Sequence, residues 1–148
     1  MSRHVFRLSR RHRLALATTL SASLVSGVAW WVLDNFCQIQ GEFDISPHPA
    51  QAWLLRFHGA AAMAALVVLG SLLPVHVLRA WRAKRNRRTG AGLLALLALQ
   101  IATGYALYYA DNPLREAAGQ LHFFLGLSLP ATLVLHIYCG RRTGKPQA

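Results

Sequence analysis

Acidic residues are scarce in this chain of 148 residues, which holds five Asp and Glu against 16 Lys and Arg and has a formal net charge of +11. Charge is also missing from four long apolar runs, in which Arg56 is the only charged side chain. The runs are residues 14–33, 52–78, 91–110 and 117–140. A basic protein that binds nucleic acid spreads its Lys and Arg over a polar face, so charge confined to short blocks excludes a nucleic-acid partner.

Each run is long enough to cross a hydrocarbon layer about 30 Å thick as a helix. In lipid the backbone N–H and C=O groups must bond within the chain, so helices are the expected structure. The sequence therefore predicts an all-α fold, a four-helix bundle integral to the membrane, which forms one transmembrane domain over residues 1–148.

The charges between the runs predict the orientation. All but two of the Lys and Arg lie before the first run, between the second and third runs, or after the fourth, and all five acidic residues lie in the other two loops. By the positive-inside rule both termini are cytoplasmic, in a multi-pass protein of the bacterial cytoplasmic (inner) membrane. The segment "SRRHRLALA" resembles the start of an export signal, but the run that follows is long for one, so we expect an uncleaved first span.

Four of the seven histidines lie inside the apolar runs, where an ionisable side chain is costly and marks a functional site by default. His58 and His76 in the second run are 18 residues apart, five whole helical turns or about 27 Å. His122 and His136 in the fourth run are 14 residues apart, about 21 Å. Because these two helices run in the same direction, His58 is expected at the level of His122 near the outer surface, and His76 at the level of His136 near the inner surface.

Two pairs so far apart cannot share one metal ion, whose ligands lie about 2 Å from it. A haem iron instead takes one imidazole on each side, so the pairs predict two b-type haems, with His58 and His122 as outer ligands and His76 and His136 as inner ligands. Filled axial positions favour electron transfer, and we expect no catalytic residue. The chain has two cysteines and no C-x-x-C-H motif, which excludes the usual covalent attachment of haem. The alternative is a haem-free membrane anchor in which the histidines form hydrogen bonds or a proton relay.

Three arginines are candidates to bind the haem propionates. Arg56 lies two residues before His58 and could form a charge-assisted pair with them, or extend to the lipid headgroups. Arg79 and Arg82 are the inner counterparts, with membrane orientation as the other explanation.

The glycines and prolines within the spans bear on how closely the helices can approach a neighbour and where they bend. Close approach of a porphyrin or ordinary helix packing would each explain the glycines at positions 59, 70, 104 and 126. Pro74 and Pro130 each lie four residues after a glycine and are expected to free its carbonyl and bend their helices. A bend at Pro74 would adjust His76, whose distance from His58 exceeds the other histidine spacing by four residues.

The chain resembles the bacterial cytochrome b561-like membrane proteins, in particular the small four-helix di-haem cytochromes that include the flavinylation-associated group. The residues that carry the resemblance are "FHGAAAM" and "HVLRAWR" in the second run, "TGYALYY" in the third, and "LHFFLG" and "LHIY" in the fourth. The resemblance implies electron transfer between quinone or quinol and a periplasmic redox protein, such as a cytochrome c or a flavoprotein, with the chain as the membrane subunit of an oxidoreductase.

The same resemblance leaves two questions open. In several b561-like proteins one ligand comes from the start of the first helix, so His12 is the alternative to His76 at the inner haem. The fold would also suit a stand-alone ferric reductase or a superoxide:quinone oxidoreductase, so the sequence leaves open whether the chain is a complete enzyme.

Overall fold

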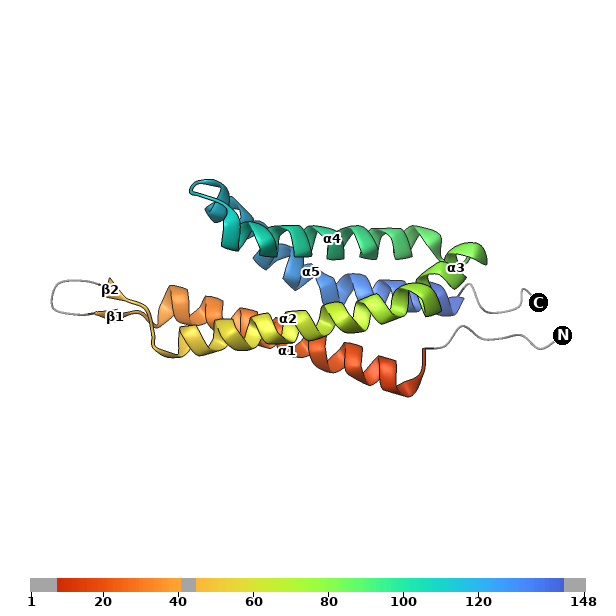
Figure 1. Cartoon of the computed structure of the whole chain (residues 1–148), viewed down its shortest axis with the longest axis horizontal. Coiled ribbons are helices and arrows are strands. Elements are labelled where there is room, and N and C mark those ends of the chain that lie inside the picture. Colours follow the sequence, from red (N-terminus) through yellow and green to blue (C-terminus); the bar gives the residue numbers. More distant parts are fainter. Residues whose placement is uncertain (1–7, 41–44, 143–148) are drawn as a thin grey trace. The chain divides into compact units, whose positions relative to one another are not determined.

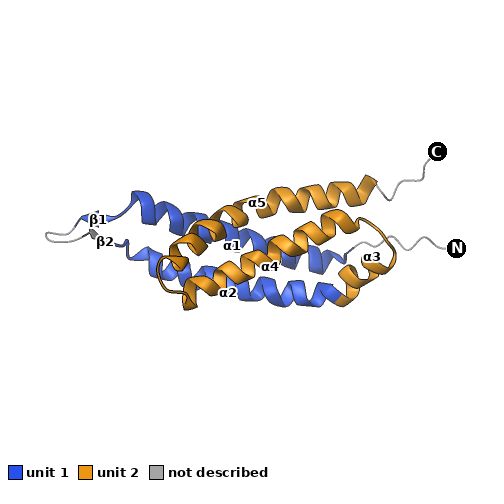
Figure 2. Ribbon diagram, turned by 90° about the horizontal axis from the view of Figure 1, so that it is seen from above, with its two compact units in different colours: residues 1–73 blue, residues 74–148 orange. Residues whose placement is uncertain are grey.

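The structure, a computed structural model, describes residues 8–40 and 45–142 (Figure 1). Its helices are α1 (Arg10–Phe36), α2 (Ala50–Leu72), a π-helical segment η1 (Leu73–Val77), α3 (Leu78–Arg82), α4 (Arg87–Tyr109) and α5 (Leu114–Arg142). Two short strands, β1 (Ile39–Gln40) and β2 (Ile45–Ser46), pair antiparallel between α1 and α2. The basic residues Arg3, Arg7 and Lys145 lie outside the described residues. The chain divides into two compact units, unit 1 (Met1–Leu73) and unit 2 (Pro74–Ala148) (Figure 2).

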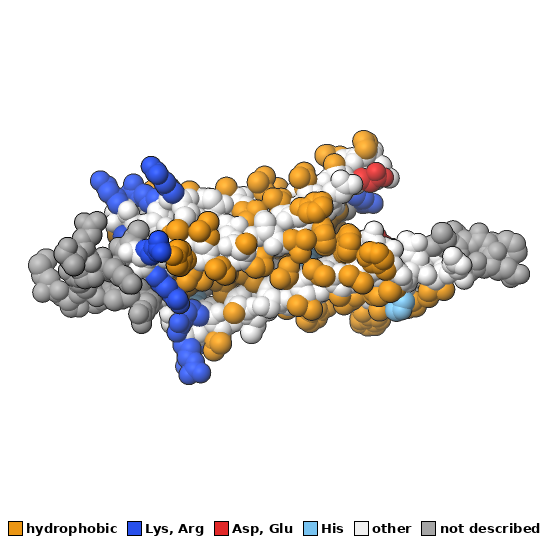
Figure 3. Space-filling model, turned by 180° about the vertical axis from the view of Figure 1, so that it is seen from behind, with side chains coloured by type: hydrophobic (Ala, Val, Ile, Leu, Met, Phe, Trp, Pro, Cys, Tyr) orange, Lys and Arg blue, Asp and Glu red, His pale blue; other side chains and the backbone are white. Residues whose placement is uncertain are grey.

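Within the described residues four helices are long and apolar enough to cross a membrane, and they correspond to the four predicted runs. The second of these helices is continuous from Ala50 to Arg82 through η1. Large apolar side chains on these helices point outward, with Val67 73% and Val134 65% exposed. In Figure 3 apolar side chains lie along the helices and Lys and Arg gather at helix ends. This is the surface of a protein whose helices face lipid, so the predicted all-α membrane fold is confirmed.

Unit 1 is a pair of packed helices, α1 and α2, joined by the strand pair. Ser9 caps α1, because its Oγ accepts a hydrogen bond from the backbone N–H of His12 at 3.2 Å. Small side chains are buried in this unit, among them Ser26 on α1 and Ala61 and Ala65 on α2. Small residues let two helix backbones approach closely, which is the usual way that helices associate in a membrane.

The helix that begins with α2 changes its hydrogen-bonding pattern at Pro74, as the sequence led us to expect. Proline has no backbone N–H, and the five residues from Leu73 to Val77 form a π-helical turn. The carbonyl of Gly70, which would have accepted from Pro74, accepts from the N–H of Leu73 instead. Pro130, by contrast, lies within the uninterrupted helix α5. Counting ordinary helical turns from His58 to His76 therefore does not hold, because Leu73, Pro74 and Val75, which lie between them, and His76 itself follow the wider π pattern.

Unit 2 contains η1 from Pro74 onward, α3, α4 and α5, with α4 packed against α5 (Figure 1). Lys84 and Asn86 in the loop before α4 have positive φ angles of 54° and 48°. The loop is held by Arg87, whose Nε and terminal nitrogen donate to the carbonyl of Trp81 at 2.9 and 2.6 Å. The Arg87 guanidinium also lies 5.2 Å from the centroid of the Trp81 ring, a cation–π contact. Asn86 is thus fixed at the start of α4, facing α5.

Candidate functional site

The four histidines of the apolar runs occupy three elements. His58 is on α2 in unit 1, His76 is in η1, and His122 and His136 are both on α5 in unit 2. No three His, Cys, Asp or Glu side chains among the described residues gather into a group that could hold a metal ion. Any metal site built on these histidines must therefore use them in smaller sets, as a haem does.

His76 and His136 face one another across unit 2. Their ring centroids are 6.4 Å apart and their ring planes are inclined at 82°. Two imidazoles on opposite sides of one metal ion have ring centres about 6 Å apart, since each nitrogen lies about 2 Å from the metal and the ring centre about 1 Å beyond. The spacing of His76 and His136 therefore fits the axial positions of one haem iron.

Hydrogen bonds select the protonated nitrogen of His136. Its Nδ1 lies 3.0 Å from Oγ1 of Thr89, and the Thr89 hydroxyl donates its own proton to Oδ1 of Asn86 at 2.6 Å. The Thr89 oxygen therefore accepts from Nδ1–H. Nδ2 of Asn86 donates to the backbone carbonyl of His136 at 2.9 Å, and its approach to Nδ1 of His136, at 3.3 Å, is the longer of the two contacts. Protonation at Nδ1 leaves the lone pair on Nε2, which is the nitrogen that a metal would bind.

His122, which lies 14 residues before His136 on α5, is held in the same way. Its Nδ1 lies 3.0 Å from Oγ1 of Thr103, whose proton goes to the carbonyl of Leu99 at 2.9 Å. The amide Nε2 of Gln100 lies 3.2 Å from Nε2 of His122, so that ring nitrogen is an acceptor. Oε1 of Gln100 is buried and has no hydrogen-bond partner among the described residues. The Gln100 amide therefore occupies the Nε2 lone pair that a metal would take, while its own carbonyl oxygen lacks a partner among the described residues.

His58 in unit 1 has the same protonation. Its Nδ1 lies 2.9 Å from the carbonyl oxygen of Ser23, which can only accept a hydrogen bond. Oγ of Ser26 lies 3.1 Å from the same nitrogen and donates its own proton to the carbonyl of Ala22 at 2.7 Å. A hydrogen bond from Nδ1 to a backbone carbonyl is the usual way in which a metal-binding histidine is oriented.

His58, His122 and His136 share one feature: each contacts a serine or threonine of the neighbouring helix, and the next residue along that helix is glycine. A Cβ on Gly27 would lie 3.1 Å from Cε1 of His58, and one on Gly104 would lie 3.3 Å from Cε1 of His122. At Gly90 the distance to Cε1 of His136 would be 3.5 Å. We name this arrangement the hydroxyl–glycine cradle, and its members are Ser26 with Gly27, Thr89 with Gly90, and Thr103 with Gly104. Each hydroxyl contacts Nδ1, and Gly27 and Gly104 make room for the ring, whereas a Cβ at Gly90 would make an ordinary contact.

Sequence reasoning missed these cradles, although a signal was present. Thr89 and Thr103 are 14 residues apart on α4, the same interval that separates His122 from His136 on α5. Of the glycines singled out in the sequence, Gly104 belongs to a cradle, and a Cβ on Gly126 would lie 3.1 Å from the Gln100 amide. Gly59 and Gly70 have no atom near enough to meet an added Cβ.

The other predicted residues lie at the helix ends. His12 is in the first turn of α1, half-buried, with its Nδ1 2.8 Å from Oγ of Ser9. The guanidinium of Arg56 lies 5.0 Å from the centroid of the Trp53 ring, a cation–π contact. Arg79 and Arg82 are exposed on α3, directly after His76.

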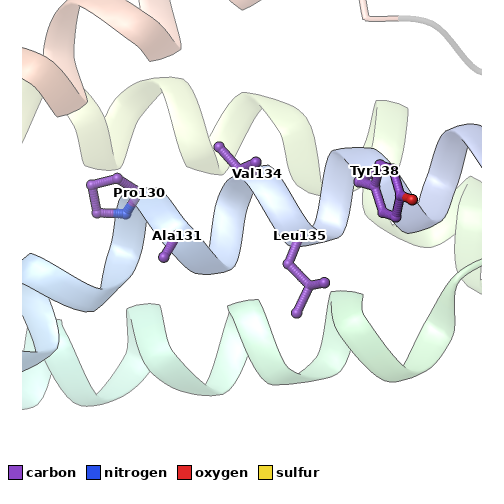
Figure 4. Close-up of a pocket in the computed structure, with 5 residues that line it drawn as sticks. All are labelled: Pro130, Ala131, Val134, Leu135 and Tyr138. Atoms are coloured by element: carbon purple, nitrogen blue, oxygen red, sulfur yellow. The ribbon is translucent and has the colours of Figure 1, made fainter.

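A shallow apolar hollow lies elsewhere, on α5 (Figure 4). Its lining side chains are Pro130, Ala131, Val134, Leu135 and Tyr138. None of them is a metal ligand or carries charge, so the hollow does not compete with the histidines as a functional site.

Comparison with known proteins gave one family. The family model described as prokaryotic cytochrome b561 matches residues 70–143, half of the chain, and this segment contains His76, His122 and His136. Searches of the curated proteins and of the solved structures found no match.

Proposed function

Because the chain belongs to the prokaryotic cytochrome b561 family, a family of electron-transferring membrane proteins that bind b-type haem, we propose that it holds two such haems. In this proposal it carries electrons across the bacterial cytoplasmic membrane between quinone or quinol and a redox partner on the outer face. The family assignment and the four membrane-spanning helices make the chain a multi-pass b-type cytochrome. A haem-free anchor with a histidine relay is thereby set aside.

The observation that carries the proposal is the pair formed by His76 and His136. When bound, haem would supply one-electron chemistry, and His76 and His136 would hold it through Nε2 of each ring. The separation of 6.4 Å between the ring centroids fits this role. Thr89 and Asn86 hold His136 in the required tautomer. His76 is therefore our preferred inner ligand, in place of His12.

The cradles support the second haem. His58 and His122 have the same tautomer as His136, with Nδ1 bound to a neighbouring helix and the lone pair on Nε2. We assign them as the two ligands of the outer haem. Arg56, kept at its end of α2 by contact with Trp53, is our candidate for the outer propionates, and Arg79 and Arg82 are those for the inner haem.

Replacing Thr103 by valine tests the outer assignment. Valine keeps the side-chain volume but removes the acceptor of the His122 Nδ1 proton, so haem affinity at this site should fall about 10- to 100-fold. Titration of the haem-free protein with haemin, followed by Soret absorption, measures the change. The matched control is Thr132→Val on α5, because the Thr132 hydroxyl donates to the carbonyl of Ser128 in its own helix. Equal affinities in the two variants would contradict a role for the cradle.

The proposed function as a whole is tested by counting haem. Protein purified from haem-supplied cells should show the absorption bands of low-spin b-type haem and give two haems per chain as the pyridine haemochrome. A quinol in detergent or vesicles should then reduce both. A count of one would leave a single-haem cytochrome. Failure of reduction by quinol, with two haems present, would remove quinol as the donor and leave the di-haem assignment standing.

A further inference from the structure

The shallow hollow on α5 is continued by a cation towards the end of that helix. Pro130, Val134, Tyr138 and Arg142 are spaced four residues apart, so they form one row along α5. All the side chains that line the hollow are exposed, Val134 by 65% and Tyr138 by 49% (Figure 4). The guanidinium of Arg142 lies 4.5 Å from the centroid of the Tyr138 ring, a cation–π contact. The row thus passes from apolar side chains to an exposed arginine.

The hollow shares one face of α5 with the two arginines at the end of the helix. At 3.6 residues per turn, an arc of about 140° contains Pro130, Ala131, Val134, Leu135, Tyr138, Arg141 and Arg142, which we call the hollow face of α5. His136 lies about 100° beyond the nearer edge of this arc, and its ring contacts Thr89 of α4. The hollow face is therefore separate from the side of α5 that packs against α4.

Positive charge collects at this end of unit 2. Arg141 and Arg142 are exposed. The loop before α4 meets the same end of α5, because a Cβ on Gly140 would lie 3.3 Å from Nδ2 of Asn86. The exposed side chains of Lys84 and Arg88, on either side of Asn86, add to the cluster.

The acidic side chains of unit 2 are at the opposite end of its helices. They are Asp111, in the loop between α4 and α5, and Glu116, in the first turn of α5. Glu116 is 26 positions before Arg142, or about 39 Å along the helix. These carboxylates cannot neutralise the arginines at the end of α5, so the cluster is open to an anion of another molecule.

The length of the hollow face matches one leaflet of a membrane. From Arg142 to Pro130 the helix rises about 18 Å, whereas half of a hydrocarbon layer is about 15 Å thick. Tyr138 lies between the arginines and the apolar side chains, and tyrosine is enriched at the boundary between headgroups and hydrocarbon. A phospholipid has the same order of parts, with phosphate at the surface and acyl chains below it.

We propose that the hollow face of α5 binds an anionic phospholipid, with the phosphate at Arg141 and Arg142 and an acyl chain in the hollow. Arginine holds phosphate by charge-assisted hydrogen bonds, which its planar guanidinium can form in pairs. A zwitterionic lipid carries an additional positive group, which the cluster repels. The site therefore selects phosphatidylglycerol over phosphatidylcholine, and this selection does not depend on the haem assignment.

The experiment measures single lipid-binding events on the full chain in detergent by native mass spectrometry. The chain is titrated with phosphatidylglycerol and with phosphatidylcholine of identical acyl chains, and we expect tighter binding of phosphatidylglycerol. Equal binding constants for the two lipids would overturn the proposal. Glycerol 3-phosphate, which has the phosphate but no acyl chain, should not displace the lipid, and displacement at equal concentration would make the arginines a phosphate site in place of a lipid site.

Removing both arginines tests the headgroup contact. Arg141→Gln with Arg142→Gln should lower the affinity for phosphatidylglycerol about 25-fold, since each basic residue near an anionic headgroup contributes about 5-fold. The control is Arg10→Gln with Arg11→Gln, which removes two exposed arginines from the start of α1. An equal loss in the control would show general attraction by charge and contradict the site. If the double variant is not recovered folded, Arg142→Gln alone decides, with a loss of about 5-fold expected and an unchanged affinity contradicting the proposal.

Filling the hollow tests the acyl-chain contact. Val134→Trp should lower the affinity for both lipids about 15-fold if two methylene groups lose their contact, and the ratio of the two affinities should stay the same. Val67→Trp on α2 makes the same substitution at a residue that is 73% exposed and lies outside the hollow. Equal affinities in the two tryptophan variants would show that no acyl chain lies in the hollow.

Discussion

Replacing His76 by alanine is expected to remove one of two low-spin haem signals, while replacing His12 leaves both. His76 has its ring centre 6.4 Å from that of His136, the separation that suits two ligands of one iron. Without His76 one axial position is empty, so the inner haem is lost on purification or becomes high-spin. Haem counting as the pyridine haemochrome, together with the low-spin bands of the visible spectrum, measures the effect.

His12→Ala is the matched control for this prediction. His12 is a half-buried residue in the first turn of α1, and its Nδ1 contacts the N-cap residue Ser9. The expected cost of the substitution is local and confined to the start of α1. Loss of the low-spin signal in His12→Ala, with His76→Ala unaffected, would make His12 the inner ligand and refute our choice.

Replacing Gly104 by valine is expected to abolish haem binding at the outer site. Even a Cβ at this position would lie 3.3 Å from Cε1 of His122, and the two further methyl groups of valine need space that the ring occupies. The ring must move, which breaks the bond between its Nδ1 and Thr103 and misdirects Nε2. We expect one haem per chain instead of two, measured on protein that still elutes as a folded species.

Gly92→Val provides the comparison, because it makes the same substitution on the same helix. An added Cβ at Gly92 has no atom within 4 Å to meet, and the residue is exposed. Both variants bear the same intrinsic helix-propensity change, so a difference between them reports on contact with His122. Equal haem counts in the two variants would show that the space at Gly104 is not needed.

Much of the fold followed from patterns that can be read along the chain. The four long apolar runs correspond to the four long helices, since the length and composition of an apolar segment decide whether it can cross a membrane. Pro74 predicted an irregular helix, because proline lacks a backbone N–H wherever it stands in a chain. The histidines stood out for a similar reason, as ionisable side chains are rare at membrane depth.

The sequence by itself thus determined the number of spans, the all-α class and the four candidate ligands. Only the tertiary structure decided which residues orient them, because hydrogen bonds join residues far apart in the chain. Asn86 and Thr89 meet His136 some fifty residues later, and Ser23 meets His58. Serine, threonine and glycine are common in membrane helices for packing alone, so their role in the cradles becomes visible only when the neighbouring helix is in place. The same contacts separate His76, which has no cradle among the described residues, from the three histidines that do.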